Sequence, residues 1–356
     1  MMRMGVVFLA LAVVACSGGA RSGVTAGGAP SSSTNAATGS GTVIVANMGD
    51  NTATLLDVAS KRVVATLPAG NGVHEVAVSH DGRWAVVSNY GVRGAPGNSL
   101  TVIDVPKAAV ARTIDLGEFK RPHGSAFLPG DSLFAVTSEV SKAVVLVNFR
   151  MGTVVGSIPT NHPASHMLAL TADGRRIYTS NVADGTVSEL DVPGRKFVRE
   201  FNVAPAVEGI TAAPGGEQVW VGSNQAKTVT VLDPSAGAAV GTLSGFGMPY
   251  RLAVTPDSRT VIITDPPNAV VRIVDRATRK DRASVKIPAD SVGPNAEFPG
   301  SPSPEGIVLS RDGRYAFVAL QGNSRVAMID IAKASVVAYM PTGAGPDGIA
   351  YSPFGR

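Results

Sequence analysis

The sequence is poor in several residue types that common protein architectures require. Of its 356 residues one is cysteine, 16% are charged and 5% are aromatic. A single cysteine excludes an intrachain disulfide and any metal site built from several cysteines. Aromatic residues are too few to suggest base stacking, and the modest net charge of +4 is spread along the chain, so no nucleic-acid partner is expected.

Common catalytic and cofactor motifs are also missing from the sequence. It contains no P-loop, no dinucleotide-binding glycine fingerprint, no Cys-x-x-Cys-His haem attachment motif and no Gly-x-Ser-x-Gly nucleophile elbow. No stretch repeats apolar residues with the period of a helix. What is abundant is glycine, with 40 residues, and proline, with 24, which indicates short strands joined by tight turns.

The N-terminal segment predicts export and lipidation. Residues 1–15 resemble a signal peptide, because Arg3 precedes an apolar run at 6–14 that is too short to cross a bilayer comfortably. The run ends in a motif that resembles the bacterial lipobox, Val13-Val14-Ala15-Cys16. The alternative is an ordinary signal peptide with a chance cysteine. We expect Cys16 to carry the lipid, which makes the chain a membrane-anchored lipoprotein facing the periplasm or the cell exterior.

Residues 16–41 are rich in Gly, Ala, Ser and Thr and should form a flexible tether between the lipid and the folded part. Several acyl chains on such a tether anchor a protein without a transmembrane helix. The rest of the chain, 42–356, is expected to be one domain.

That domain is built from an internal repeat. An aliphatic strand that ends in Asp or Asn occurs seven times, at spacings of 47, 44, 43, 42, 42 and 55 residues, ending at Asp57, Asp104, Asn148, Asp191, Asp233, Asp275 and Asp330. This period fits four short strands per repeat. The sequence therefore predicts an all-β, seven-bladed β-propeller with four-stranded blades.

A second element lies between these copies, an apolar strand followed by an Asp-Gly turn and a strand that often ends in Ser-Asn. Examples of the turn are Asp81-Gly82, Asp173-Gly174 and Asp312-Gly313, where glycine accepts a positive φ. The strands at 177–181 and 219–224 resemble the signature strand of the YVTN-repeat family. The resemblance extends from about Thr42 to the end of the chain, and it implies an exported propeller.

The two ends of the chain are expected to share one blade. The first copy lacks an innermost strand, whereas residues 347–352 look like an innermost strand with no blade of their own. Pairing them would close the ring and protect the edges of the sheets.

The start of each innermost strand is the candidate binding site. Aligned on a shared small residue, these strands carry a side chain that binds protons, metals or hydrogen-bond partners at one equivalent position: His74, His123, His166, Glu208, Tyr250, Glu305 and Asp347. The next position is mostly glycine, with Glu75, Met167 and Arg251 as exceptions. Arg251 is included among the candidate ligand-binding residues.

Three interpretations of this ring remain open. His74, His123 and His166 come from consecutive blades and could hold a zinc-like divalent metal with one position open. The ring could instead bind a ligand through His and carboxylate groups without a metal. Strand starts near water also tolerate polar residues that have no function.

We expect the propeller to act as a binding or scaffold module, a monomer whose channel mouth takes a small molecule or a partner protein. The alternative is a metal-dependent hydrolase or lyase that resembles the propeller lactonases, with Glu208 or Glu305 as the candidate base. Two long loops, 90–99 and 288–303, are predicted to lie on the same face and to shape the site.

Overall fold

The computed structural model describes residues 39–290, 292–293 and 296–355. The expected signal peptide, Cys16 and most of the tether lie outside the described residues. Contacts of the folded part begin slightly before the expected boundary, since the Val58 amide donates to the Gly41 carbonyl and the Tyr351 hydroxyl donates to the Ser40 carbonyl. Within the described part of the chain, no helix has the length and apolar character needed to span a membrane.

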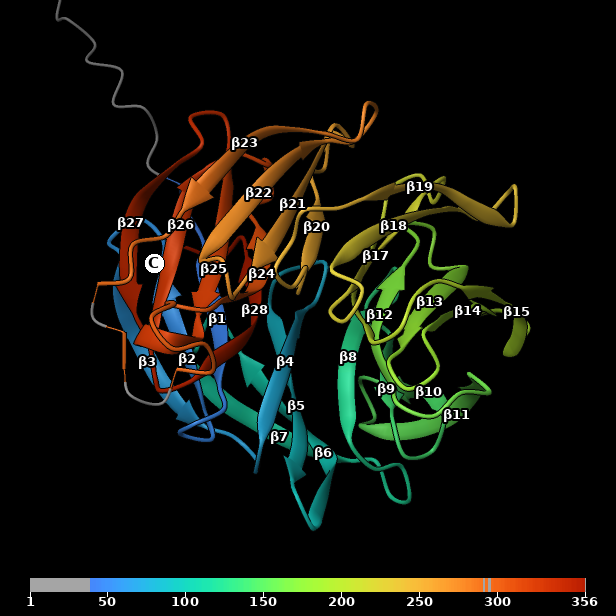
Figure 1. Ribbon diagram of the computed structural model, residues 1–356. Helices are drawn as coiled ribbons and strands as arrows, with labels where there is room; N and C mark the ends of the chain where they lie inside the picture. The colour runs from blue at the N-terminus through green and yellow to red at the C-terminus, as the bar shows by residue number, and fades with distance from the viewer. Residues whose placement is uncertain (1–38, 291, 294–295, 356) are drawn as a thin grey trace, which may run out of the picture. The chain divides into compact units, whose positions relative to one another are not determined.

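Seven antiparallel four-stranded sheets form a ring around a central channel, as Figure 1 shows. Blade 1 consists, from the channel outward, of β28 (Pro346–Ser352), β1 (Thr42–Asn47), β2 (Thr52–Asp57) and β3 (Arg62–Pro68). Blades 2 to 4 follow in chain order as β4 (Val73–Val78), β5 (Trp84–Val92), β6 (Ala95–Asp104), β7 (Ala109–Asp115); β8 (Pro122–Phe127), β9 (Leu133–Ser138), β10 (Ala143–Asn148), β11 (Thr153–Pro159); and β12 (Ser165–Leu170), β13 (Arg176–Asn181), β14 (Thr186–Asp191), β15 (Lys196–Asn202).

Blades 5 to 7 have the same order, with their first strand at the channel. They consist of β16 (Val207–Ala212), β17 (Val219–Ser223), β18 (Thr228–Asp233), β19 (Ala238–Leu243); β20 (Leu252–Val254), β21 (Thr260–Asp265), β22 (Val270–Asp275), β23 (Lys280–Lys286); and β24 (Pro304–Leu309), β25 (Tyr315–Leu320), β26 (Arg325–Asp330), β27 (Ser335–Pro341). A single short 3-10 helix, η1 (Gln321–Asn323), is found among the described residues.

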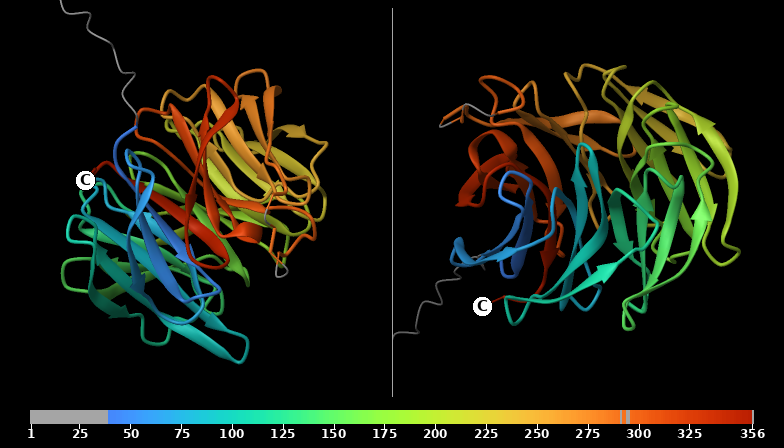
Figure 2. Two further views of the ribbon diagram at one scale, coloured as in Figure 1. Left: turned by 90° about the vertical axis from the view of Figure 1, so that its left-hand side faces the viewer. Right: turned by 90° about the horizontal axis from the view of Figure 1, so that it is seen from below.

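The predicted closure of the ring is confirmed. β28 pairs antiparallel with β1, with Thr42 opposite Ser352 and Val45 opposite Ile349. Figure 2 shows this as the red C-terminal strand lying beside the blue N-terminal one. β1 is buried along its whole length, and its pairing with β28 covers the edge that β1 would otherwise leave open toward the channel.

The hydrophobic core lies between the blades. Side chains alternate along a strand, so Ile44 and Ala46 pack toward blade 2 whereas Val43 and Val45 pack toward blade 7. The described residues form seven buried clusters of this kind, one at each blade interface. The ring is therefore held by packing at seven similar interfaces.

The repeated Asp residues shape the turns. The seven residues that define the sequence period each accept backbone N–H groups from the turn that follows; for example, Asp57 accepts from Ser60, Asp275 from Thr278 and Asp330 from Lys333. These are the Asx-type bonds that favour Asp and Asn in turns. The Asp-Gly turns behave as predicted, with φ of 77° at Gly82 and 69° at Gly313.

Candidate functional site

Every innermost strand carries a β-bulge near its start. In blade 2, for example, Val73 pairs with Asn89 and Val76 with Val87, so that His74 and Glu75 together oppose Ser88. The same irregularity occurs in β8, β12, β16, β24 and β28, and backbone bonds between Thr264 and the two residues Tyr250 and Arg251 reproduce it in blade 6. A bulge redirects side chains away from the regular alternation of a strand. The seven predicted positions are thus the first residues of seven equivalent bulges.

The glycines that follow these positions have a common steric role. A Cβ on Gly306 would lie 1.9 Å from the carbonyl oxygen of Asp347, and one on Gly348 would lie 2.1 Å from that of His74. Gly124 and Gly209 meet the backbone of the next blade in the same way. The inner strands of neighbouring blades therefore touch at the bulge, which only glycine permits at these places.

Hydroxyl groups opposite the bulges link one blade to the next. Four of them donate to the carbonyl oxygen of the following blade's ring residue at 2.6–2.9 Å: Ser88 to His123, Thr137 to His166, Ser180 to Glu208 and Thr264 to Glu305. These bonds satisfy buried carbonyl groups that the irregular strand pairing leaves free. They hold the ring residues at fixed positions around the channel.

The predicted histidine row is assembled. The ring centroids of His74 and His123 are 5.2 Å apart, and those of His123 and His166 are 3.6 Å apart. Tyr90, which follows β5's Asn89, packs its ring 4.6 Å from that of His74 and 5.3 Å from that of His123. Burial lowers the pKa of His74, and lowers that of His123 well below its usual value.

His166 differs from the other two histidines because carboxylates hold both of its nitrogens. Nδ1 donates to Glu139, and Nε2 lies 2.8 Å from Oε1 of Glu208. Burial alone would lower the pKa of His166, but the two carboxylates outweigh it and raise the pKa to about 10. His166 is therefore an imidazolium at neutral pH. Glu139 also accepts the hydroxyl proton of Tyr90, which connects the histidine row to this ion pair.

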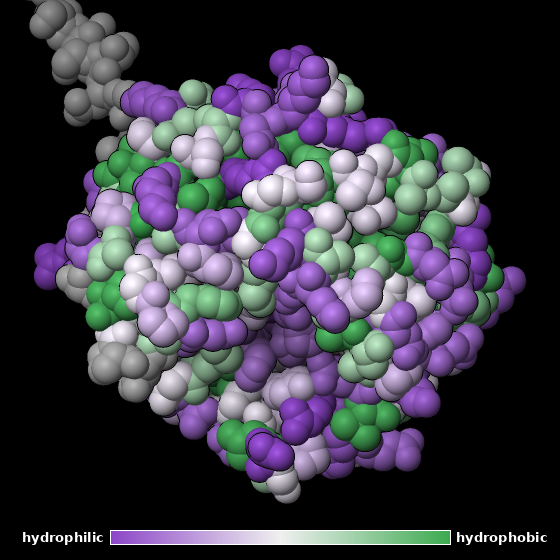
Figure 3. Space-filling view, viewed as in Figure 1, coloured by the Kyte–Doolittle hydropathy of each residue, from purple (hydrophilic) through white to green (hydrophobic). Residues whose placement is uncertain are grey.

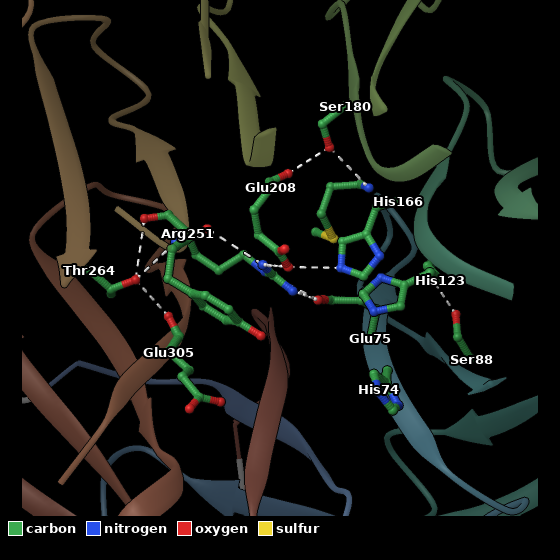
Figure 4. Close-up of polar contacts among 12 residues, drawn as sticks. His74, Glu75, Ser88, His123, His166, Ser180, Glu208, Arg251, Thr264 and Glu305 are labelled. Carbon is green, nitrogen blue, oxygen red and sulfur yellow. Dashed lines mark hydrogen bonds and ion pairs between the residues drawn. The ribbon is translucent and has the colours of Figure 1, made fainter. Parts of the chain in front are cut away.

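An arginine continues the network across the channel, as Figure 4 shows. Arg251 of blade 6 bonds Glu208 of blade 5 at 3.0 Å and Glu75 of blade 2 at 2.8 Å. Burial would raise the pKa of Glu208, but His166 and Arg251 outweigh it and lower the pKa to about 2. A buried chain of ion pairs, Glu139–His166–Glu208–Arg251–Glu75, consequently joins blades 2 to 6 at the start of the channel.

Glu75, Glu139 and Tyr90 were not among the predicted site residues. The sequence did mark Glu75 and Arg251, since both stand where most blades have glycine. In the structure Glu75 and Arg251 form an ion pair with each other, because a blade with glycine at this second bulge position has no side chain to extend across the channel. Glu139 directly follows β9, and Tyr90 occupies the equivalent place within the longer β5; the alignment of the inner strands does not mark this place.

A metal site built from His74, His123 and His166 stays a prediction, and His166 would have to release a carboxylate to join it. A metal needs a nitrogen lone pair from each imidazole, and His166 donates protons from both nitrogens. His74 uses Nδ1 to donate to the Gly72 carbonyl, which leaves Nε2 for a ligand, and Nδ1 of His123 is buried with no partner in the described ranges. Among the described residues no set of three metal-ligating side chains lies in suitable positions.

Glu305 and Asp347 lie in the part of the ring that the network does not include. Both are 1% exposed, and Glu305 Oε1, Glu305 Oε2 and Asp347 Oδ1 have no hydrogen-bond partner among the described residues. Burial and mutual repulsion raise the pKa of Glu305 well above its usual value, and burial and Glu75 raise that of Asp347 to about 7. Tyr250 places its ring under Arg251, with 4.2 Å between the guanidinium carbon and the ring centroid.

Both long loops lie where the inner strands begin, as expected from strand order. β5 and β6 extend into a hairpin that pairs Gly91 with Pro96, and the segment 288–303 links β23 to β24. A cavity of about 540 Å³ lies beside this segment, between Gly293, Gln321 and Ala344. In Figure 3, hydrophilic residues gather around a hollow at the centre of the face in view.

A further cavity lies at the other end of the inner strands and was not predicted. It has a volume of about 440 Å³, and its lining includes Ala77, Ala126 and Ala350, the small residues on which the repeats align. Those small side chains leave room along the channel axis. Their recurrence at one position of the inner strands was the feature of the sequence that could have predicted the cavity.

Comparisons with known proteins support the fold. No protein-family model and no curated protein matches the sequence. A solved structure of the hydrazine synthase of Kuenenia stuttgartiensis is similar over 79% of this chain and 90% of its own, with a TM-score of 0.67 and 19% identity. A functionally unknown protein from Desulfotomaculum acetoxidans is similar over 88% and 99%, with a TM-score of 0.69 and 15% identity. At these identities the likeness concerns the fold, and membership of the YVTN-repeat family stays a prediction.

Proposed function

We propose that this chain is an exported, lipid-anchored propeller of the YVTN-repeat type that binds a small polar ligand at the end of the channel where the inner strands begin. The observation that carries the proposal is that all seven equivalent bulge positions hold a side chain that forms hydrogen bonds or ionises. Burying such groups is costly unless they have partners or a purpose. The structural partners account for His166, Glu208 and Arg251, but leave polar atoms of other ring members unpaired.

A small ligand suits the ring better than a protein surface does. His123, Glu305 and Asp347 are each 1% exposed, so a large partner could not reach them. Propellers commonly serve as binding platforms, and the β5–β6 hairpin extends beyond the length of the other blades' hairpins at the end where the inner strands begin.

Binding is preferred to the lactonase-like hydrolase or lyase because of how the candidate bases are ionised. Glu208 has a pKa of about 2 and is held between His166 and Arg251, which makes it a weak base. Burial raises the pKa of Glu305 well above its usual value, which favours the neutral acid over the carboxylate. An efficient general base has a pKa near the working pH and a free lone pair.

The binding proposal is tested by a thermal-shift screen of small charged and polar metabolites. The matched variant is His74→Gln with His123→Gln, which keeps the size of the ring side chains, and Arg311→Gln on the turn before β25 serves as the control. We expect at least one compound that raises the melting temperature of the wild type and the control but not of the double variant. Compounds that stabilise all three proteins equally would contradict a site at this ring.

The lipid anchor rests on the lipobox-like motif and on the placement of the sole cysteine at Cys16. Cys16→Ser should move the protein from the membrane fraction to the soluble fraction of the exporting cells, while Ser17→Ala should not. Continued membrane association of the Cys16→Ser protein would refute the anchor and leave the ring proposal untouched.

A further inference from the structure

The acidic side of the ring has acceptors without donors. Glu305 is the second residue of the inner strand of blade 7 and Asp347 that of blade 1, and Gly306 allows these strands to touch. The two carboxyl groups therefore belong to neighbouring blades and influence one another's ionisation. Three of their oxygens, Glu305 Oε1, Glu305 Oε2 and Asp347 Oδ1, have no partner within the described part of the chain, although both residues are 1% exposed. Buried acceptors without partners are rare in folded proteins, because each has lost its bonds to water.

Carboxyl groups also outnumber cations at this end of the channel. Arg251 and His166 are fully engaged by the carboxylates of Glu75, Glu139 and Glu208. No basic group of the described residues bonds to Glu305 or to the unpaired oxygen of Asp347. The ionisable groups that act on the pair are Glu75, Glu208, Glu297, Arg251, His166 and Tyr250. A bound positive charge would therefore be stabilised here, provided that it also donates hydrogen bonds.

We infer that Glu305 and Asp347 bind the ammonium group of a primary amine, as the part of the site that selects the ligand of the proposed function. A primary ammonium has three N–H donors, and the pair offers three unpaired oxygens. Hydrogen bonds between ionised partners are the strongest that such a site can form. The inference rests on the proposed binding function and adds to it the chemical class of the ligand.

A monovalent ammonium suits the site better than a divalent metal ion does. Calcium takes six to eight oxygen ligands, and magnesium needs near-octahedral geometry. The described residues hold no suitable group of three metal-ligating side chains. Arg251 also acts on both carboxyl groups, and its positive charge repels a dication more strongly than a monocation.

The experiment uses the folded chain and four salts: methylammonium, tetramethylammonium, potassium and calcium chloride at equal ionic strength. Thermal shift and isothermal titration calorimetry measure binding to the wild type, to Glu305→Gln and to Asp347→Asn. Both variants keep the shape of the side chain and resemble the protonated acid, so both should fold. Glu118→Gln, an exposed carboxylate in the connection between β7 and β8, is the control.

Methylammonium should stabilise the wild type and the control, and its affinity should fall at least tenfold in each variant. Tetramethylammonium has the same charge but no N–H donor, and should bind at least tenfold more weakly. Because binding displaces a proton from the pair, the affinity for methylammonium should rise as the pH passes from 6 to 8, and the measured heat should depend on the buffer.

Equal effects of the two ammonium ions, or an effect that survives both substitutions, would overturn the inference. So would calcium or potassium binding that depends on the pair when methylammonium binding does not. If methylammonium fails while the metabolite screen finds a different ligand that needs His74 and His123, the amine inference falls and the proposed function stands.

Discussion

Replacing Arg251 by leucine should expose how much the channel network contributes to stability. The arginine side chain is 6% exposed and joins Glu75 and Glu208. Leucine preserves much of the apolar volume but leaves two carboxylates buried without their shared cation. The variant should fold, since the core lies at the seven blade interfaces, but it should melt at a lower temperature.

The magnitude follows from the ionisation of Glu208. Its pKa is lowered from 4.5 to about 2 by His166 and Arg251 together, and one pKa unit corresponds to about 1.4 kcal/mol, so that Arg251 contributes at most about 3 kcal/mol through Glu208. Removing one partner of a buried ion pair costs about 3–5 kcal/mol in general. With an unfolding entropy of about 2 cal/mol/K per residue over about 300 residues, the melting temperature should fall by about 5–8 °C.

The effect should depend on pH in a defined direction. The lowered pKa of Glu208 means that its contribution is fully present above 4.5 and is lost as the pH falls toward 2. In the leucine variant the same carboxylate is buried without Arg251, so protonation relieves it as the pH falls. The difference in melting temperature between the two proteins should therefore narrow between pH 7 and pH 3.

Differential scanning calorimetry across this pH range tests the reasoning. Arg83→Leu is the control, because Arg83 is 48% exposed in its ion pair with Asp104 and should contribute less than about 1 kcal/mol. In a Glu75→Gln, Glu208→Gln background, loss of Arg251 should cost much less than in the wild type. A variant that melts with the wild type at pH 7, or a difference that is the same at pH 3, would refute the account of the network.

Two further predictions concern the ring itself. Deleting residues 347–356 removes most of β28 and leaves the buried β1 without its neighbour, so the whole domain should unfold or aggregate; a truncated protein with the wild-type melting temperature by circular dichroism would contradict closure by this strand. Gly348→Ala should lower the melting temperature by several degrees, because its Cβ would lie 2.1 Å from the His74 carbonyl oxygen. Gly293→Ala is its control, since the nearest atom there is 3.4 Å away, and equal melting temperatures of the two variants would show that the strands do not touch at the bulge.

The fold could be predicted because its determinants are local and repeated. Each terminal Asp or Asn of the repeat bonds to its own turn, within three residues in sequence, so the period of the sequence is also the period of the structure. Closure was predictable for a related reason. The first repeat lacks an inner strand, and the C-terminal strand has no repeat of its own. The two can therefore form a complete blade only by pairing with each other.

The equivalence of the seven ring positions could also be predicted, since it follows from aligning the repeats. What the alignment lacked was the direction of the side chains. The bulge that redirects His74 and Glu75 arises from pairing with β5, and it cannot be seen in the residues of β4 alone.

The sequence by itself determined the number of blades, the order of the strands and the shared position of His74, His123, His166, Glu208, Tyr250, Glu305 and Asp347. Only the tertiary structure decided which of these side chains form ion pairs with other residues. Arg251 and Glu75 lie 176 residues apart and meet because the ring brings blades 6 and 2 to opposite sides of one narrow channel. Ion pairing is a short-range interaction whose partners depend on that geometry, so His166 became a buried cation while Glu305 and Asp347 were left without donors.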